Sequence, residues 1–139
     1  MPLLFISYKR GTSAVGGIKA RIERAGYRTW FDRDEIHLGD PDWRARIDTG
    51  LERCDGLILM LTAAAAASEP VQYEVAQALK REEPIFPLVL EHLDDWGAAL
   101  TQVGLTPSQH AEDFTDVAQW DAQIERLLRD LVKQGLRVT

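Results

Sequence analysis

Short, wholly apolar runs recur along the chain, and segments with helical spacing of apolar residues separate them. Residues 3–6 and 57–61 are two such runs, each of which stops at polar residues or at a small-residue stretch. A continuous apolar run of this length is typical of a strand buried on both faces of a parallel sheet. Strand and helix alternate five times with short connections, which implies right-handed crossovers. The sequence therefore predicts an α/β fold, a flavodoxin-like three-layer sandwich with a five-stranded, mostly parallel sheet and helices on both faces.

Five strands are expected, at residues 3–6, 28–31, 57–61 and 85–90 and, more weakly, near Phe114. Pro87 removes a backbone donor, so it predicts that the fourth strand lies at an edge or contains a bulge. A short helix is expected near residues 94–101. Four further helices are expected from these apolar stripes: Val15, Ile18, Ile22 and Ala25; Trp43, Ile47 and Leu51; Val71, Val75, Ala78 and Leu79; Val117, Trp120, Ile124, Leu127, Leu128 and Leu131.

Residue types at the helix ends support these boundaries. Thr12 or Ser13 is expected to cap the first helix, and Gly26 to end it in a left-handed turn. Ser68 is a good N-cap for the helix that contains Val71, and Pro70 is tolerated in a first turn, where its missing N–H has no intrahelical partner.

Composition narrows the class of protein. A chain of 139 residues has room for one domain, and a net charge of -6 argues against a general affinity for nucleic acid. No apolar run approaches the roughly 20 residues that a membrane span requires. The lone Cys54 fits a reducing, cytoplasmic compartment and is expected to be a core residue, and three histidines far apart in the sequence predict no metal site.

Several common α/β sites lack their motifs. The sequence has no Gly-rich turn ending in Lys-Ser or Lys-Thr, no correctly spaced dinucleotide fingerprint and no Gly-x-Ser-x-Gly elbow. A phospho-receiver would carry acidic residues after its first strand, where this chain has Ser7, Tyr8, Lys9 and Arg10. These absences exclude nucleotide-binding P-loop, receiver and serine-hydrolase assignments.

Three segments, in this order, resemble the boxes of TIR (Toll/interleukin-1 receptor-like) domains. LLFISYKRG (residues 3–11) is similar to the opening strand and its Ser-Tyr and basic residues. YRTWFDRDEIHLGDPDW (27–43) is similar to the second strand and the BB loop, and SEPVQYEVAQAL (68–79) to the third-helix motif. The resemblance covers nearly the whole chain and implies a single TIR domain over residues 1–139.

The resemblance to the bacterial NAD-cleaving type implies an activity. Such TIR domains cleave the nicotinamide–ribose bond of NAD with the glutamate of the third-helix motif, which corresponds to Glu74. The implied enzyme is an NAD glycohydrolase that gives nicotinamide and ADP-ribose or a cyclic ADP-ribose variant, and acts in bacterial defence or signalling. NAD would be the substrate, with no further cofactor. The implied partners are other TIR domains, through activating self-association, and a fused or separate ligand-sensing domain.

The chemistry of this reaction suits a carboxylate at that position. Bond cleavage builds positive charge on the ribose, and a nearby carboxylate stabilises it. On a helical wheel that places Val71 at 0°, Glu74 lies at about -60°, at the border of the apolar stripe. The family's tryptophan four residues before the glutamate is Pro70 here, so Tyr73 is expected to supply an aromatic surface instead.

Other polar and aromatic residues after the strands are candidates for substrate binding. Lys9 and Arg10 are expected either to hold the phosphates of NAD or to form a solvated loop edge. Tyr8 and Trp43 either stack on the ligand or pack in the core, and Asp32 is a candidate for orienting a loop. The alternative function is a non-catalytic adaptor module that pairs with other TIR domains through the BB loop, residues 35–42.

Overall fold

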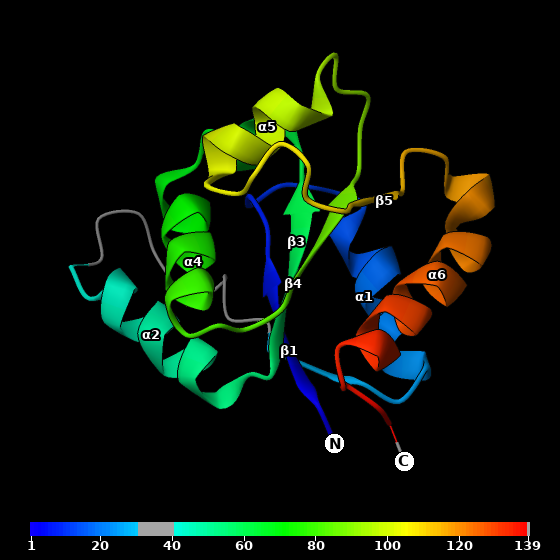
Figure 1. Cartoon of the computed structure of the whole chain (residues 1–139), viewed down its shortest axis with the longest axis horizontal. Coiled ribbons are helices and arrows are strands. Elements are labelled where there is room, and N and C mark those ends of the chain that lie inside the picture. The colour runs from blue at the N-terminus through cyan, green and yellow to red at the C-terminus, as the bar shows by residue number, and fades with distance from the viewer. Residues whose placement is uncertain (31–40, 139) are drawn as a thin grey trace.

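Among the residues that the structure, a computed structural model, describes (1–30 and 41–138), five strands form one sheet in the order β2-β1-β3-β4-β5 (Figure 1). Every pairing between neighbouring strands is parallel. This confirms the predicted flavodoxin-like sheet, whose strand order reverses at β1. The strands are β1 (Leu3–Ser7), β2 (Arg28–Trp30), β3 (Gly56–Leu61), β4 (Ile85–Val89) and β5 (Glu112–Asp113).

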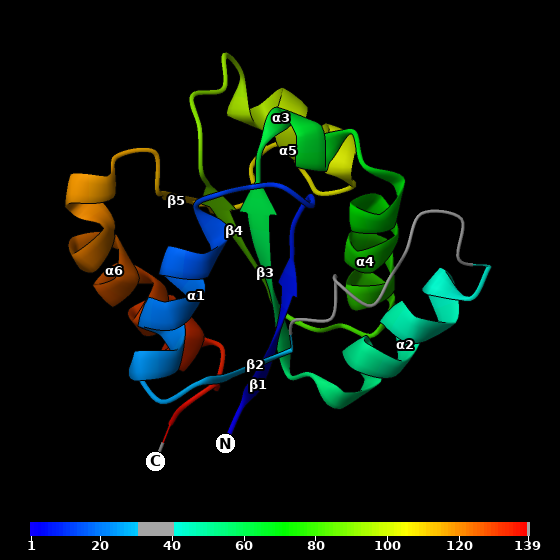
Figure 2. The same cartoon turned by 180° about the vertical axis from the view of Figure 1, so that it is seen from behind.

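Helices cover both faces of this sheet, as Figures 1 and 2 show from opposite sides. One face carries α1 (Val15–Arg24) and α6 (Trp120–Lys133), which the 3-10 turn η2 (Val117–Gln119) precedes. The other face carries α2 (Trp43–Arg53), α3 (Ala63–Ala66), α4 (Glu69–Lys80) and α5 (Trp96–Val103). The result is the expected three-layer arrangement. None of the helices in the described part of the chain is long and apolar enough to cross a membrane.

The sheet divides the core into two clusters, because successive side chains of a strand point to opposite faces. On β1, Phe5 packs in the cluster under α2 and α4, whereas Leu4 and Ile6 pack in the cluster under α1 and α6. The same alternation turns Ser7 toward the α2/α4 layer and Tyr8 toward the α1/α6 layer. The last residue of β1 and the residue after it therefore lie on opposite sides of the sheet.

The prediction that Pro87 marks an edge or a bulge is wrong, because β4 lies between β3 and β5 with regular pairing. In a parallel pair, alternate residues bond to the same neighbour. On either side of β4, the carbonyl oxygen of Pro84 accepts from Leu57 N and the N–H of Leu90 donates to Leu61 O. The even-numbered residues between them therefore form their hydrogen bonds with β3. Pro87 turns its nitrogen to the other side, where β5 pairs only with Leu88 and Val89. No ladder bond is lost there.

Three of the four predicted helix-end features are confirmed, and one of them is Pro70 in the first turn of α4. Gly26 has φ 102°, in the left-handed region, and the Ser68 hydroxyl accepts a hydrogen bond from Val71 N at 3.4 Å. The predicted cap of α1 is wrong. Its N-cap is Ala14 without a side-chain bond, because Thr12 donates its hydroxyl to Lys9 O at 2.7 Å and so closes the turn after β1 instead.

Other differences from the sequence prediction lie at element ends. The alanines after β3 form the short helix α3, which Thr62 caps by accepting from Ala65 N at 3.0 Å. Leu79 and Val117, predicted to be buried, are 47% and 64% exposed, because each lies at the end of its stripe. The fifth strand is Glu112–Asp113, and the predicted Phe114 follows it as a buried core residue. The short helix predicted near residues 94–101 is present as α5.

Candidate active site

Glu74 is a buried carboxylate on α4 that accepts a hydrogen bond from the last residue of β1. The Ser7 hydroxyl donates to Glu74 Oε1 at 2.7 Å. Glu74 is 1% exposed and Ser7 is 0% exposed, so the bond is shielded from water. A buried carboxylate is costly unless donors satisfy it, and Ser7 supplies one of them.

The position of this pair in the sheet is the one where ligands bind in open α/β folds. Such ligands lie beyond the carboxyl ends of the strands, at the point where the strand order reverses. Here the order reverses between β1 and β3, since α1 follows β1 on one face and α4 follows β3 on the other. Ser7 is the carboxyl-terminal residue of β1 and pairs in register with Leu59 of β3. The Ser7–Glu74 pair therefore lies at the topological switch point.

The local sequence of α4 explains why Glu74 faces inward. Ser68 starts the helix, and Val71, Val75 and Ala78 form its buried stripe against the sheet. Glu74 lies three residues after Val71, hence on nearly the same side of the helix. The helical wheel predicts that Glu74 lies at the border of the apolar stripe. In the structure its side chain is more deeply buried than a border position implies, and it is hydrogen-bonded to Ser7.

Beside Glu74 in sequence, Tyr73 joins a cluster that links α4 to α2. Its ring meets Trp43 edge-on, with centroids 5.4 Å apart and planes at 79°, and its hydroxyl donates to both carboxylate oxygens of Asp48 at 2.9 and 3.1 Å. The Arg44 guanidinium lies 4.4 Å from the centre of the Trp43 ring and pairs with Glu69 at 2.7 Å. Burial, followed by the hydrogen bond to Asp48, raises the pKa of Tyr73. The structure thus brings together two of the predicted binding residues, Trp43 and Tyr73.

The other predicted binding residues are distributed differently. Tyr8 is 5% exposed and packs in the α1/α6 cluster, on the face of the sheet opposite Glu74. Lys9 and Arg10 are exposed in the turn that follows β1, after Ser7 and Tyr8. Asp32 lies outside the described residues, as does most of the BB loop.

Sequence reasoning did not single out Ser7 as a site residue. Its signal was present in the strand alternation, because Ser7 shares a face with Phe5 and stands at the end of the first buried strand. A polar residue there, on the core side, requires a partner. Only the structure identifies that partner as Glu74.

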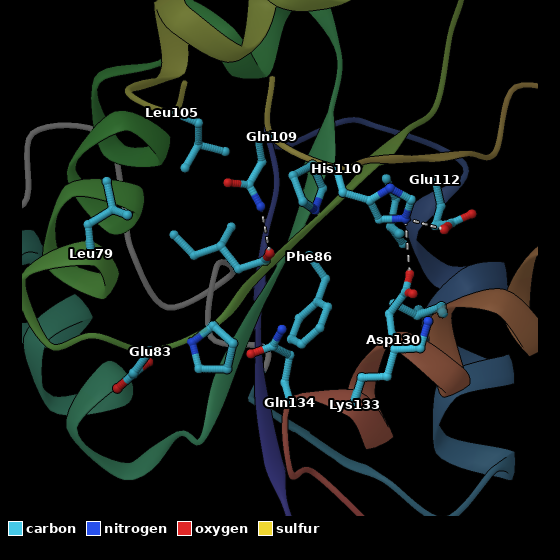
Figure 3. Close-up of a pocket in the computed structure, with 15 residues that line it drawn as sticks. Leu79, Glu83, Phe86, Leu105, Gln109, His110, Glu112, Asp130, Lys133 and Gln134 are labelled. Atoms are coloured by element: carbon cyan, nitrogen blue, oxygen red, sulfur yellow. Dashed lines mark hydrogen bonds and ion pairs between the residues drawn. The ribbon is translucent and has the colours of Figure 1, made fainter. Parts of the chain in front are cut away.

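The described residues also line a cavity of about 330 Å³, and this cavity is separate from the Ser7–Glu74 pair. It lies beside β4, between the end of α4 and α6, and neither Ser7 nor Glu74 lines it (Figure 3). Its walls combine apolar residues such as Phe86 and Leu105 with Glu83, His110 and Asp130. This cavity is therefore not the site that the third-helix motif and the sheet topology indicate.

Cys54 is a core residue, as predicted. It is 7% exposed and belongs to the cluster under α2 and α4. Burial, and to a smaller extent the nearby carboxylates of Glu83 and Asp55, raise the pKa of its thiol to about 12. At neutral pH the thiol is therefore protonated and is a poor nucleophile or metal ligand.

Solved structures of similar fold come from several kinds of protein. The TIR domain of the Toll-related receptor TRR-2 from Hydra magnipapillata superimposes with a TM-score of 0.64 at 15% identity, covering 92% of this chain and 96% of that one. The TIR domains of the activated Roq1 resistosome, which directly recognises the pathogen effector XopQ, give 0.63 at 16% identity and cover 94% and 99%. A prokaryotic SEFIR domain gives 0.63 at 16% identity and covers 93% and 97%. At these identities the likeness concerns the fold.

The sequence itself decides the family. No curated protein is significantly similar to this chain in sequence. The sequence pattern of the family described as "TIR domain" matches residues 4–129, which includes both Ser7 and Glu74. The chain therefore belongs to the TIR domain family.

Proposed function

We propose that this TIR domain is an NAD glycohydrolase and that Glu74 is its catalytic carboxylate. The observation that carries the proposal is the burial of Glu74 at the topological switch point of the sheet, hydrogen-bonded to Ser7. The same glutamate is the one that matches the third-helix motif of NAD-cleaving TIR domains. Motif and topology support one residue independently.

The chemistry needs little beyond this carboxylate. Nicotinamide leaves NAD as a neutral molecule, so its departure requires no acid partner. Positive charge develops on the ribose, and a carboxylate in a shielded environment stabilises that charge more strongly than one in water. Ser7 fixes the orientation of Glu74 before substrate binds, so little reorganisation is needed when the charge develops.

Substrate contact requires the site to open, because Glu74 is only 1% exposed. We propose that self-association of TIR domains drives this opening and completes the site, so that NAD cleavage depends on assembly. Lys9 and Arg10 lie in the exposed turn after Ser7, where cations suit the phosphates of NAD. The edge formed by Trp43 and Tyr73 offers aromatic surface for the bases. The product would be ADP-ribose or a cyclic variant, released in the cytoplasm during bacterial defence or signalling.

The test is nicotinamide release by the wild type and by Glu74→Ala, both held at high density on a multivalent support. We expect release by the wild type and none above background by the variant, with circular dichroism spectra that show both proteins folded. High density is essential, since dilute wild-type protein lacks the proposed assembly. Wild-type release rates in folded Glu74→Ala would contradict the assignment.

A second candidate function is that of a non-catalytic interaction module. The burial of Glu74 favours it, because a carboxylate that is only 1% exposed cannot contact a substrate. On this alternative, assembled wild type consumes no NAD, and Glu74→Ala self-associates as the wild type does. Sedimentation of both proteins alongside the nicotinamide assay separates the two functions.

A further inference from the structure

Three side chains of metal-binding type converge where β5 meets α6. His110 Nε2 lies 2.6 Å from Glu112 Oε1 and 3.4 Å from Asp130 Oδ2 (Figure 3). One ligand atom from each of the three residues lies within 4.8 Å of the others. We call these residues the β5–α6 triad. None of the three residues takes part in the proposed cleavage of NAD by Glu74.

The fold explains why the three meet. Glu112 is the first residue of β5 and His110 precedes it by two positions, and their side chains meet with His110 Nε2 2.6 Å from Glu112 Oε1. Asp130 lies in the last turns of α6, which packs against that edge of the sheet through Leu127 and Leu131. A strand and a helix thus supply ligands from two directions.

Two of the three residues of the triad, Glu112 and Asp130, are carboxylates with little exposure to solvent. The Glu112 side chain is only 10% exposed and that of Asp130 is 23% exposed. Two close carboxylates of this kind are relieved by a proton or by a cation between them. Their arrangement is therefore one that a divalent ion would stabilise.

We propose that His110, Glu112 and Asp130 bind a divalent transition-metal ion of the zinc class. One imidazole nitrogen and two carboxylate oxygens suit Zn²⁺ or Co²⁺, whereas Mg²⁺ and Ca²⁺ prefer oxygen ligands alone. Histidine spacing alone does not reveal such a site, because two of its three ligands are acidic.

The distances agree with this assignment after one small movement. Tetrahedral zinc ligands at about 2.0–2.2 Å from the ion lie about 3.3 Å from one another. The 3.4 Å separation of His110 and Asp130 already fits, and the 2.6 Å hydrogen bond between His110 and Glu112 must open. The His110 side chain is 71% exposed, so its ring is free to turn. The ion would replace the hydrogen bond between His110 and Glu112.

The neighbouring cavity provides room for further ligands. His110, Glu112 and Asp130 all line the cavity of about 330 Å³, so a fourth position on the ion would face open space. A metal site with three protein ligands commonly keeps such a position for water or an anion. The bound ion would also join β5, the two-residue edge strand, to α6.

Isothermal titration of the untagged, full chain with Zn²⁺ and with Co²⁺ tests the proposal. We expect one ion per chain, a visible Co²⁺ absorption band, a higher melting temperature with Zn²⁺ and no comparable binding of Mg²⁺. His110→Ala and Asp130→Asn should each weaken Zn²⁺ binding by roughly 100-fold or more, since loss of a direct ligand exceeds the 10–100-fold effect of losing an outer partner. Matched controls are His92→Ala and Glu125→Gln, which remove an exposed histidine and an exposed acid of α6 outside the triad. Both should bind as the wild type does.

X-ray absorption at the zinc edge of the wild-type complex reads the ligands without any variant. One imidazole among oxygen ligands is expected. Absence of saturable binding to the wild type, a spectrum without imidazole, or wild-type affinity in folded His110→Ala and Asp130→Asn would each overturn the proposal. Equal binding of Mg²⁺ would overturn its assignment to a transition metal.

Discussion

Ser7 donates its hydroxyl to Glu74 across 67 positions of sequence, and the two oxygens lie 2.7 Å apart in the core. The bond connects the end of β1, where the sheet order reverses, with the middle of α4. It joins two of the three family boxes in one contact. The orientation of the carboxylate is thus set by the fold before any ligand arrives.

Ser7→Ala should destabilise the protein by about 1–3 kcal/mol, because it removes a donor from a buried carboxylate. The free energy of unfolding from urea titration measures this. Thr49→Ala is the control, since the Thr49 hydroxyl is exposed and bonds within its own helix to Ala45 O. That change should stay within about 0.5 kcal/mol.

A double-mutant cycle with Glu74→Ala isolates the pair. In the Glu74→Ala background, Ser7→Ala should cost at least about 1 kcal/mol less than in the wild type, because its partner is gone. Identical costs in both backgrounds would show that the hydrogen bond contributes nothing to stability.

Gly50→Ala should destabilise the contact between α2 and the sheet. A Cβ atom at residue 50 would lie 2.6 Å from Trp30 Nε1 and 3.0 Å from Phe5 Cε2, so the indole or the helix must shift. The overpacking cost of about 1–3 kcal/mol exceeds the gain of about 1 kcal/mol in helix propensity. Thermal and urea unfolding should both report the loss.

Gly16→Ala is the matched control for Gly50→Ala. Residue 16 is in the first turn of α1, and a Cβ there meets nothing within 4 Å. The same substitution should therefore stabilise the protein by up to about 1 kcal/mol. If both glycine variants shift stability in the same direction, steric contact with Trp30 is not the deciding effect.

Glu83→Gln should change how stability depends on pH. Burial, against the opposing charge of Arg81, raises the pKa of Glu83 from its ordinary 4.5 to about 7, and Oε2 has no hydrogen-bond partner in the described part of the chain. Between these two values the folded protein holds a proton that the unfolded chain has lost. The contribution of Glu83 to the free energy of unfolding therefore falls as pH rises from 4.5 to 7.

The variant should remove this decline. At pH 8 Glu83→Gln should be more stable than the wild type by about 1 kcal/mol, after allowance for solvent screening, with a smaller difference at pH 5. The free energy of unfolding, measured by urea titration at both pH values, checks this prediction. Glu82→Gln, at the exposed neighbouring residue, is the control. An equal gain at both pH values would mean that ionisation of Glu83 is not its cause.

Much of the fold was predictable because its signals are local. The apolar run at β3 and the stripe of α6 each determine their element without help from the rest of the chain. The prediction for Pro87 was wrong because the nitrogen of Pro87 faces β5, which is too short to pair with it. The length and position of β5 are long-range properties that the sequence around Pro87 does not reveal. Thr12 was misassigned because its hydroxyl can cap a helix or close a turn, and sequence does not choose between them.

The candidate site was less predictable, because it depends on which face each residue takes. The motif indicated Glu74, but its partner Ser7 follows only from strand alternation combined with the crossover of α4. Tyr8, adjacent to Ser7 in the same motif, points to the opposite layer. The β5–α6 triad is a further case, since Asp130 is 18 positions from Glu112 and shares no motif with it.

The measurement that tests the central claim most directly is the rate of nicotinamide release from NAD by densely immobilised Glu74→Gln. Glu125→Gln provides the matched control, because it makes the same chemical change at an exposed position of α6, on the opposite face of the sheet. Loss of a stabilising carboxylate should lower the rate by roughly 100-fold or more, as losing one oxyanion-type interaction does. The account predicts that loss for folded Glu74→Gln and a near wild-type rate for Glu125→Gln. Wild-type release by folded Glu74→Gln would contradict it.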